Sequence, residues 1–265
     1  MPTAQTRELT PQMYAEERHR QILQACASDG RVSVSGLAAR FDVATETIRR
    51  DLDALDRRGL IRRVHGGAIP RLDGDIEPDL RTRLTTNTEA KHRIAAAAAD
   101  FLPTDPDASV VLDAGSTVVE LVPYLAGRGL RVATHGLDIA QALLDADVEP
   151  VDILPGRLRG RTHAAVGADT VRALSRLHPD TVFLGCNGMG AAGFTTPDPD
   201  EASAKSAMVA QSSRRIVMAD ASKAGLTQFV TFAELADIDV LVTDTALPAS
   251  SLQLFEHSGI EVVRA

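Results

Sequence analysis

The feature that most constrains the fold is an alternation, from residue 109 onward, of short apolar runs with longer helix-forming stretches. The apolar runs have the length of strands and cover 110–112, 131–134, 151–154, 181–184, 216–219, 240–243 and 262–263. The helix-forming stretches cover 117–125, 137–145, 170–177, 201–213 and 250–257. This alternation is typical of βα units, which build a mostly parallel sheet with helices on both faces. We therefore predict an α/β domain over residues 89–265, whose ligands bind outside the carboxyl ends of the strands.

Residues 14–71 show a different pattern, that of a small helical unit. Helices are expected over 15–27, up to Phe41, and over 45–58, where Gly59 ends the last one. Along this last helix the apolar side chains recur at i, i+4 and i+7, so polar side chains occupy the opposite face. The apolar positions are Ile48, Leu52 and Leu55.

A basic hairpin follows that helix directly: 60–64 has the pattern of a strand, 65–67 of a turn, and 68–69 of a return strand. Helices followed at once by such a hairpin indicate a winged helix-turn-helix, whose last helix enters the DNA major groove. An arginine pair alone is more often part of a solvated helix face, so the order of the parts carries this prediction. The expected DNA contacts are Thr45, Thr47, Arg49, Arg50, Arg57, Arg62, Arg63 and His65.

Charge and composition agree with two different domains. The whole chain has a formal net charge of −8, but residues 1–71 hold 12 basic and 9 acidic side chains and are net positive. The chain is long enough for two domains, with a flexible tail expected at 1–13 and a polar linker at 72–88. It has only two cysteines, 160 positions apart, and no apolar stretch of about 20 residues. We expect a cytoplasmic protein with no membrane segment, disulfide framework, bound metal or cofactor.

Small and charged residues gather where the predicted strands end. After 110–112 come Asp113, Gly115, Ser116 and Thr117, which supply hydroxyls, a close backbone and a helix N-terminus. Together these suit a phosphate or carboxylate, although the same string also occurs as a plain strand-to-helix turn.

Lysine use points to the same strand ends. Only three of the 28 basic residues are lysines: Lys91, Lys205 and Lys223. A retained lysine can mark a place that needs a compact ammonium, though three residues also fall together by chance. Glu201 and Lys205, spaced i, i+4, are either a surface ion pair or part of an anion pocket.

Both halves resemble the DeoR family of bacterial transcriptional regulators. The first half carries ER-x-x-Q-I-L, TIRRDL at 47–52 and L-x-x-x-G-L-I-x-R-V-H-G-G-A at 55–68, and the second carries LDAGST, FLGCNG, E-x-x-x-K and D-x-S-K. The resemblance implies a C-terminal fold like that of ribose-5-phosphate isomerase. It also implies that this C-terminal domain binds a phosphorylated sugar or a related metabolite. The effector-binding residues that it and the strand-end positions imply are Asp113, Gly115, Ser116, Thr117, His135, Gly156, Arg157, Gly188, Glu201, Lys205 and Lys223.

The chain departs from the family pattern at a few positions. Ala44 stands where the family usually has a helix-capping serine, and Ser116 replaces the first threonine of the phosphate loop. His135 replaces an asparagine and Pro155 a glycine, which indicates an altered sugar-recognition side. His135 is either a ligand to an effector hydroxyl or a structural histidine.

These observations favour a transcriptional regulator, most simply a repressor of a carbohydrate operon controlled by a phosphorylated sugar. Its partners would be operator DNA, the anionic effector and further copies of itself, as a homodimer or homotetramer. One alternative is a sugar-phosphate isomerase-like enzyme with a DNA-binding appendage, in which Glu201 acts as a base. Another is a DNA-binding protein whose sensor site is degenerate.

Overall fold

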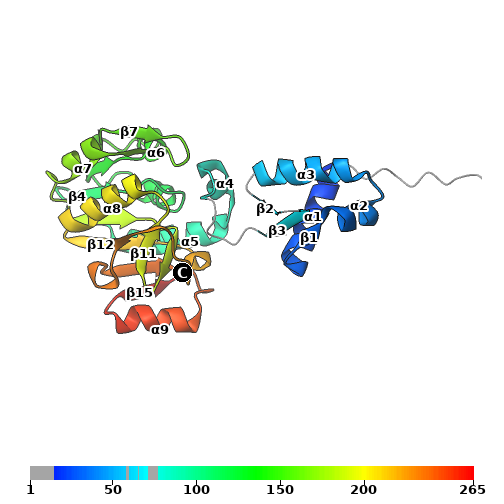
Figure 1. Ribbon diagram of the computed structural model, residues 1–265. Helices are drawn as coiled ribbons and strands as arrows, with labels where there is room; N and C mark the ends of the chain where they lie inside the picture. Colours follow the sequence, from blue (N-terminus) through cyan, green and yellow to red (C-terminus); the bar gives the residue numbers. More distant parts are fainter. Residues whose placement is uncertain (1–14, 58–59, 65, 71–76) are drawn as a thin grey trace, which may run out of the picture. The chain divides into compact units, whose positions relative to one another are not determined.

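The computed structural model describes residues 15–57, 60–64, 66–70 and 77–265, and the chain divides into compact units at 1–76 and 77–265 (Figure 1). Each unit has its own core, and each is described separately below. None of the helices in the described ranges is long and apolar enough to cross a membrane.

The first unit contains three helices and a small antiparallel sheet among its described residues. The helices are α1 (Ala15–Asp29), α2 (Val34–Phe41) and α3 (Thr45–Arg57), and the strands are β1 (Val32–Ser33), β2 (Ile61–Val64) and β3 (Gly67–Pro70). β3 lies between β1 and β2 and pairs with both. The order helix, strand, two helices and hairpin is that of the predicted winged helix-turn-helix.

The predicted apolar stripe of α3 is the centre of this unit. Ile48, Leu52 and Leu55 are fully buried and pack with Ile22 of α1 and Ile61 of β2. α3 begins at Thr45 as predicted, although Ala44 has no side-chain acceptor for a cap; the Ala44 carbonyl accepts from the Thr47 and Ile48 amides.

A buried ion pair joins α1 to α3. The guanidinium of Arg18 donates twice to the Asp51 carboxylate, with Nε 2.5 Å from Oδ2 and Nη2 3.1 Å from Oδ1. His19 Nε2 lies 3.0 Å from the same Oδ1. This contact fixes the face of α3 opposite its exposed arginines, so it orients the helix expected to read DNA.

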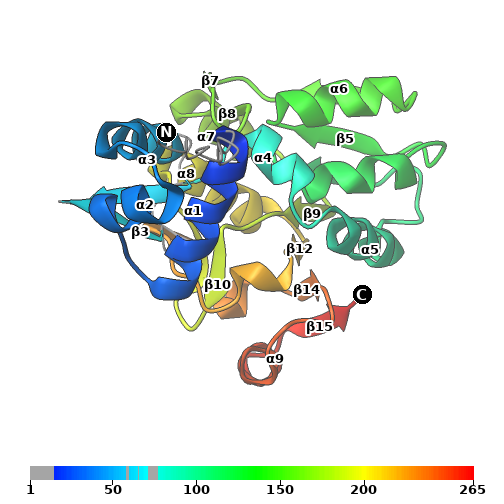
Figure 2. The same cartoon turned by 90° about the vertical axis from the view of Figure 1, so that its right-hand side faces the viewer.

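The second unit is built on a parallel sheet in the order β15-β14-β12-β9-β4-β5-β6. Its strands are β4 (Ser109–Leu112), β5 (Arg131–Thr134), β6 (Val151–Ile153), β9 (Thr181–Leu184), β12 (Arg214–Met218), β14 (Val240–Thr243) and β15 (Glu261–Arg264). Every one of these strands coincides with a predicted strand, and every pairing is parallel. Figure 2 shows this order from β5 down to β15.

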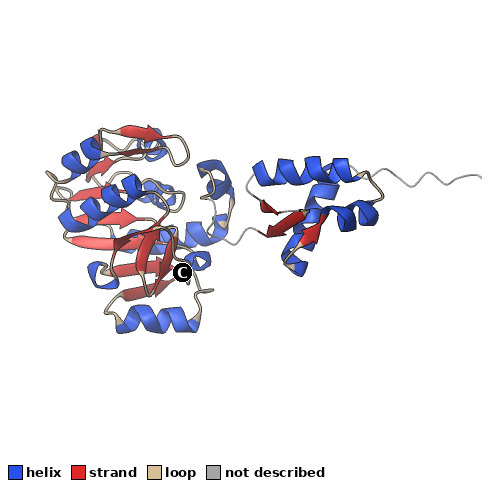
Figure 3. Cartoon of the chain, viewed as in Figure 1, coloured by secondary structure: helices blue, strands red, loops and turns tan. Residues whose placement is uncertain are grey.

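Helices cover both faces of this sheet, as the alternation predicts (Figure 3). On one face α5 (Thr88–Ala98) and α6 (Leu137–Asp145) pack on strand residues such as Val110 and Phe183. On the other face α8 (Pro199–Gln211) and α9 (Ala249–His257) pack on residues such as Val111 and Val182. Neighbouring residues of one strand therefore serve opposite cores, as the pleat requires. A further helix, α7 (Ala168–Leu174), belongs to this second face.

The strand order places the ligand-binding point of the sheet. From β4 the chain moves outward through β5 and β6, then returns to the other side of β4 with β9 and moves outward through β12, β14 and β15. The direction thus reverses between β4 and β9. In open sheets of this kind the loops at such a reversal separate and leave a crevice for ligands.

The structure also differs from the sequence prediction in local elements. Part of the expected linker, from residue 77, belongs to the second unit and forms α4 (Leu80–Thr85), capped by Asp79, whose Oδ1 accepts from the Thr82 amide at 2.8 Å. The helix expected at 117–125 is the 3-10 helix η2 (Val118–Tyr124), because Pro123 cannot continue an α-helical ladder.

Several short strands and 3-10 turns had no counterpart in the prediction. They are β7 (Arg157–Arg159), β8 (Ala164–Val166), β10 (Gly188–Gly190), β11 (Gly193–Thr196), β13 (Val230–Ala233), η3 (Ala221–Lys223) and η4 (Leu235–Asp237). The 3-10 turn η1 (Ala99–Phe101) directly follows α5, and the two together coincide with a helix predicted over 89–102. β7 pairs with β8, and β11 pairs with both β10 and β13, all antiparallel.

Candidate functional site

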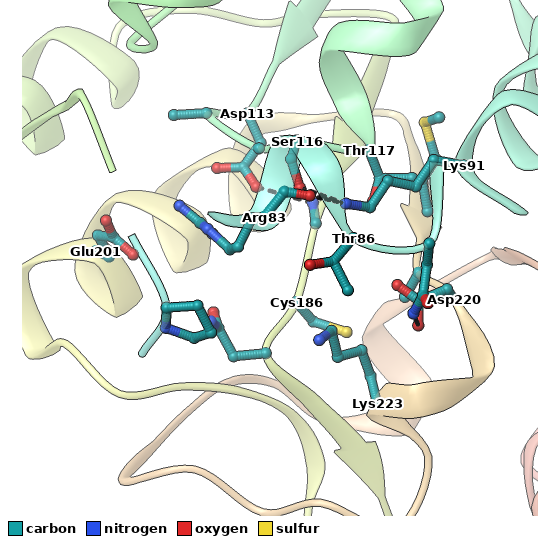
Figure 4. A pocket seen from close by; sticks show the side chains of 18 of the residues that line it. Arg83, Thr86, Lys91, Asp113, Ser116, Thr117, Cys186, Glu201, Asp220 and Lys223 are labelled. Carbon is teal, nitrogen blue, oxygen red and sulfur yellow. Dashed lines mark hydrogen bonds between the residues drawn. The ribbon is translucent and has the colours of Figure 1, made fainter. Parts of the chain in front are cut away.

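A pocket lies at the reversal point of the sheet, over the carboxyl ends of β4, β9 and β12 (Figure 4). The space inside it, including its opening to solvent, is about 750 Å³. Its lining comes from strand-end loops, from α5 and α8, and from the segment around α4. The lining residues are Pro78, Arg83, Thr86, Asn87, Lys91, Asp113, Ala114, Gly115, Ser116, Thr117, Gly185, Cys186, Asn187, Glu201, Lys205, Met218, Ala219, Asp220 and Lys223.

Asp113 is a fully buried carboxylate in the lining of this pocket. Its Oδ2 accepts from the Lys205 ammonium and, at 2.8 Å, from the Gly185 amide, while its Oδ1 lies 3.0 Å from His135 Nε2. Burial alone would raise the pKa of Asp113, but Lys205 and His135 outweigh burial and hold the pKa well below its usual range. Asp113 is therefore a carboxylate that fixes the position of Lys205.

Lys91 forms the opposite wall, next to the loop after β4. Its ammonium donates to the Arg83 carbonyl and, at 3.0 Å, to Ser116 Oγ. Burial lowers the pKa of Lys91, and the nearby Asp220 opposes that effect. Asp220 is itself held by Asn87, whose Nδ2 donates to Oδ1 at 3.0 Å. An ammonium has three N–H donors, so Lys91 keeps one for a ligand.

Two further cations of the pocket have no close ion-pair partner among the described residues. No hydrogen bond or ion pair that links described residues uses the Lys223 ammonium, and the same holds for Nε and Nη2 of Arg83. All three lysines of the chain thus line one pocket, together with an arginine. Against these four cations the lining holds three carboxylates, Asp113, Glu201 and Asp220, so its formal charge is +1, although residues 72–265 hold 16 basic and 27 acidic side chains.

Glu201 and Cys186 also line the pocket, but neither is prepared for catalysis. Glu201 accepts from Thr162 Oγ1 and, at 3.1 Å, from Arg159 Nη1, so its carboxylate is already engaged. Burial raises the pKa of Cys186 to about 12, so the thiol is protonated at neutral pH and is a poor nucleophile.

Most of the predicted effector-binding residues come together in this pocket, and four do not line it. Asp113, Gly115, Ser116, Thr117, Glu201, Lys205 and Lys223 line it. His135, Gly156, Arg157 and Gly188 follow β5, β6 and β9 but lie outside the lining.

The structure gives each of these four residues another role. His135 is buried behind Asp113 and its Nδ1 donates to the Ala165 carbonyl at 2.8 Å, so it is a structural histidine. A side chain at Gly156 or Gly188 would collide with Thr170 Oγ1 or the Leu226 carbonyl, so both glycines serve packing. Arg157 is largely exposed and pairs with Asp200 at 2.6 Å.

Sequence reasoning did not assign several lining residues, above all Arg83, Asn87 and Asp220. Arg83 and Asn87 fall in the stretch that was expected to be linker. Lys91 was noted only for the rarity of lysine, which turns out to be the signal that marks the pocket wall.

The predicted DNA-contacting residues of α3 lie on its exposed side. Thr45, Arg49 and Arg50 are exposed and Thr47 is half-buried. Arg50 is the freest of them, with 82% of its side chain exposed and only a 4.0 Å approach to Glu46. Arg49 Nη1 lies 3.2 Å from Glu46 Oε2, an exposed pair that is easily exchanged for a phosphate.

The predicted contacts of the hairpin are described in part. Arg63 is half-buried and its Nε lies 3.1 Å from Asp53 Oδ1, so the protein already engages it. His65 and the side chains of Arg57 and Arg62 lie outside the described residues. Across the described ranges, no group of three or more His, Cys, Asp or Glu side chains could hold a metal ion.

Comparison with known proteins decides the family. A model of the DeoR-like helix-turn-helix domain matches residues 18–70, and a model of the DeoR C terminal sensor domain matches residues 86–245. The chain belongs to the DeoR family of transcriptional regulators. This confirms the resemblance seen in the sequence, and it makes the chain a regulator and not an enzyme.

Relatives of this DeoR-family regulator align along almost their whole length. The HTH-type transcriptional regulator GlpR of Haloferax volcanii is 37% identical, over 95% of this chain and 98% of that protein. The HTH-type transcriptional regulator FruR of Bacillus subtilis is 35% identical, over 88% and 92%. The glycerol-3-phosphate regulon repressor of Escherichia coli is 29% identical, over 94% and 99%.

Among solved structures the likeness is more distant. The eIF2B delta subunit of Chaetomium thermophilum gives a TM-score of 0.43 at 17% identity, over 88% of this chain and 72% of that one.

Proposed function

We propose that this DeoR-family regulator is a repressor of a carbohydrate-metabolism operon. We further propose that a phosphorylated sugar or polyol bound in the pocket controls its affinity for operator DNA. One observation carries the proposal: all three lysines of the chain and Arg83 line a single pocket at the reversal point of an otherwise acidic unit. An anion is the ligand that this charge distribution favours. The name of the Escherichia coli relative, a glycerol-3-phosphate regulon repressor, agrees with a phosphorylated effector.

The contacts inside the pocket support a phosphate over a simple monovalent anion. Lys205 and Lys91 are held in place by protein acceptors yet keep an N–H each, while Lys223 is uncommitted. Hydroxyls at Ser116 and Thr117 add donors beside them. A phosphate has enough charge and acceptor oxygens to use several such donors at once.

The pocket also bears on whether the sensor is degenerate. His135 and Pro155, where the chain departs from the family pattern, both lie outside the lining. Those departures therefore leave the cationic groups of the pocket in place.

On the DNA side, we propose that α3 enters the major groove and that Arg50 contacts a base or a phosphate. A single winged helix offers a small contact area, so tight binding needs two half-sites and hence a homodimer or homotetramer. The effector would act by favouring one of two arrangements of the paired DNA-binding units.

The effector is tested by isothermal titration of the protein with glycerol 3-phosphate and a panel of sugar phosphates, each beside its unphosphorylated parent. We expect one phosphorylated compound to bind and its parent to bind far more weakly. Lys223→Gln should weaken that binding, and Arg172→Gln should not, because Arg172 is exposed and pairs with Asp169 away from the lining. If no phosphorylated compound binds, the sensor is degenerate and the proposal fails.

The DNA contact is tested with fluorescently labelled DNA from upstream of the gene. Arg50→Ala should abolish specific binding with little change in thermal stability, since the side chain is exposed. Arg20→Ala, a matched change of an exposed arginine on α1, should leave binding intact. Equal affinity of Arg50→Ala and the parent protein would remove Arg50 from the contact set.

A further inference from the structure

Arg83 of α4 carries an unsatisfied guanidinium in the pocket wall. Its Nε and Nη2 are buried and have no hydrogen-bond partner. Within the described ranges it is the only side chain with two such atoms. Figure 4 shows the side chain extending into the space between the other labelled residues.

Two orphaned N–H groups on a charged side chain are costly. A buried polar group without a partner loses its hydration and gains nothing in return, and for a charged group the loss is larger. Nε and Nη2 form one edge of the planar guanidinium, and that edge matches two oxygens of a single carboxylate or phosphate. Nε and Nη2 of Arg83 therefore lack one specific partner, an oxyanion with two oxygens.

Among the described residues, no carboxylate forms a hydrogen bond with Nε or Nη2 of Arg83. Glu77 is near enough for Arg83 to oppose the rise of its pKa, which burial and Glu201 cause. Its Oε2 lies 2.5 Å from Arg159 Nη1, whereas its Oε1 is buried without a hydrogen-bond partner, and no ion pair within 4.0 Å links Glu77 to Arg83. The carboxylates of the lining already have partners, which are Lys205 for Asp113, Arg159 for Glu201 and Asn87 for Asp220.

We propose that Arg83 is an effector ligand, which binds two oxygens of one anionic group, a phosphate, through Nε and Nη2. This rests on the proposed function and adds a binding residue from outside the strand-end loops. The same residue presents its carbonyl to Lys91 and its guanidinium to the ligand, so a bound phosphate ties α4 to the pocket.

The helix that carries Arg83, α4, lies close in sequence to the DNA-binding unit. The second unit begins at Glu77 and α4 begins at Leu80, so α4 is the first helix that follows the DNA-binding unit. A ligand that holds Arg83 therefore stabilises the helix of the second unit that lies nearest in sequence to the DNA-binding unit. The other lining residues belong to loops and helices further along the chain, apart from Pro78.

The test uses the full-length protein and inorganic phosphate as the probe, with binding measured by isothermal titration. Arg83→Gln should weaken phosphate binding by about 10- to 100-fold, since hydrogen bonds to a charged group are lost. Arg83→Lys, which keeps the charge but not the paired N–H edge, should also bind less tightly than the parent protein. Arg81→Gln is the matched control, because Arg81 is exposed on the same helix and outside the lining.

A second readout separates a ligand from a structural arginine. Without phosphate, Arg83→Gln should unfold at nearly the same temperature as the parent protein, because Nε and Nη2 make no hydrogen bond in the protein and only the longer-range attraction to Glu77 is lost. Phosphate should slow amide exchange over residues 79–87 in the parent and Arg81→Gln proteins, but not in Arg83→Gln.

The outcomes are distinct. If Lys223→Gln weakens phosphate binding while both Arg83 variants bind as the parent protein does, the proposed function stands and the role of Arg83 is overturned. A lower unfolding temperature of ligand-free Arg83→Gln, with unchanged phosphate affinity, would overturn it as well. A parent protein that binds no phosphate at all would remove the anion site and this inference with it.

Discussion

Replacing Asp113 by asparagine tests the buried cluster that positions Lys205. The side chains of Asp113 and Lys205 are 1% and 5% exposed, so water screens their interaction very little. Asparagine has nearly the same shape but no charge, and its NH₂ group cannot accept a hydrogen bond. The change therefore leaves Lys205 as a buried ammonium without a counter-charge and deprives the Gly185 amide or His135 of its partner.

The expected loss follows from these contacts. Breaking a buried ion pair by removing one partner costs about 3–5 kcal/mol in the free energy of unfolding. For a unit of this size, 1 kcal/mol corresponds to a Tm shift of about 2–4 °C, so the second unit should melt roughly 6–20 °C lower. Since the pKa of Asp113 lies well below its usual range, this contribution persists at neutral and mildly acidic pH. It is lost only as the pH falls below the usual carboxyl range.

The assay is calorimetric and urea-induced unfolding of the full-length protein at pH 7. Asp152→Asn serves as the control, because Asp152 forms an exposed pair with Arg131 and should change stability by less than about 1 kcal/mol. Adding Lys205→Met to Asp113→Asn should recover part of the loss, since the uncompensated charge disappears. If Asp113→Asn is as stable as Asp152→Asn, the buried pair does not hold the pocket together and the reasoning is refuted.

Three further predictions follow from single contacts. Asp51→Asn should destabilise the first unit by about 3–5 kcal/mol, because Arg18 loses a buried partner; faster amide exchange in α1 and α3 would show it, and unchanged exchange would contradict it. Ala44→Ser should stabilise the first unit by roughly 1 kcal/mol by capping α3, measured by urea unfolding, and no gain would mean that the helix start is already satisfied. Burial and Glu201 raise the pKa of Glu77 above its ordinary value of 4.5, so near this pH the folded state binds more protons than the unfolded state. The free energy of unfolding should therefore fall as the pH rises from 4.5 through the raised pKa of Glu77. Glu77→Gln should flatten that part of the stability–pH curve, and an unchanged slope would show that another group is responsible.

The sequence predicted the frame of the molecule because its signals are local. Each strand of the central sheet is a short apolar run, and the faces of α3 follow from the spacing of Ile48, Leu52 and Leu55. The short strands β10 and β11 had no such signal. They are glycine-rich, and β11 is stabilised by β13, which is distant in the sequence.

Only part of the site was predicted from the sequence, because the position of a residue after a strand does not say which strands are neighbours. Strand-end positions identify which loops face the ligand edge, but the order of the strands decides which loops meet. His135 and Gly156 follow β5 and β6, which lie on the outer side of β4, whereas the pocket lies between β4 and β9. Strand order is a tertiary property that the apolar pattern does not encode.

Arg83 could not be found from local pattern at all. The segment around α4 is polar and has no apolar periodicity, and its order depends on contacts within the second unit. Glu77 pairs with Arg159, and the Leu80 amide donates to the Arg161 carbonyl at 3.0 Å. Only these long-range contacts turn an apparent linker into a wall of the pocket.

The central claim is that an anion in this pocket controls DNA binding by the winged helix. Its most direct test is the affinity of the protein for its operator, measured by fluorescence anisotropy with and without the phosphorylated compound that binds most tightly. We predict that the compound changes operator affinity about 5-fold or more in the parent protein and much less in Lys223→Gln. A compound that saturates the pocket and leaves operator affinity unchanged would contradict the account.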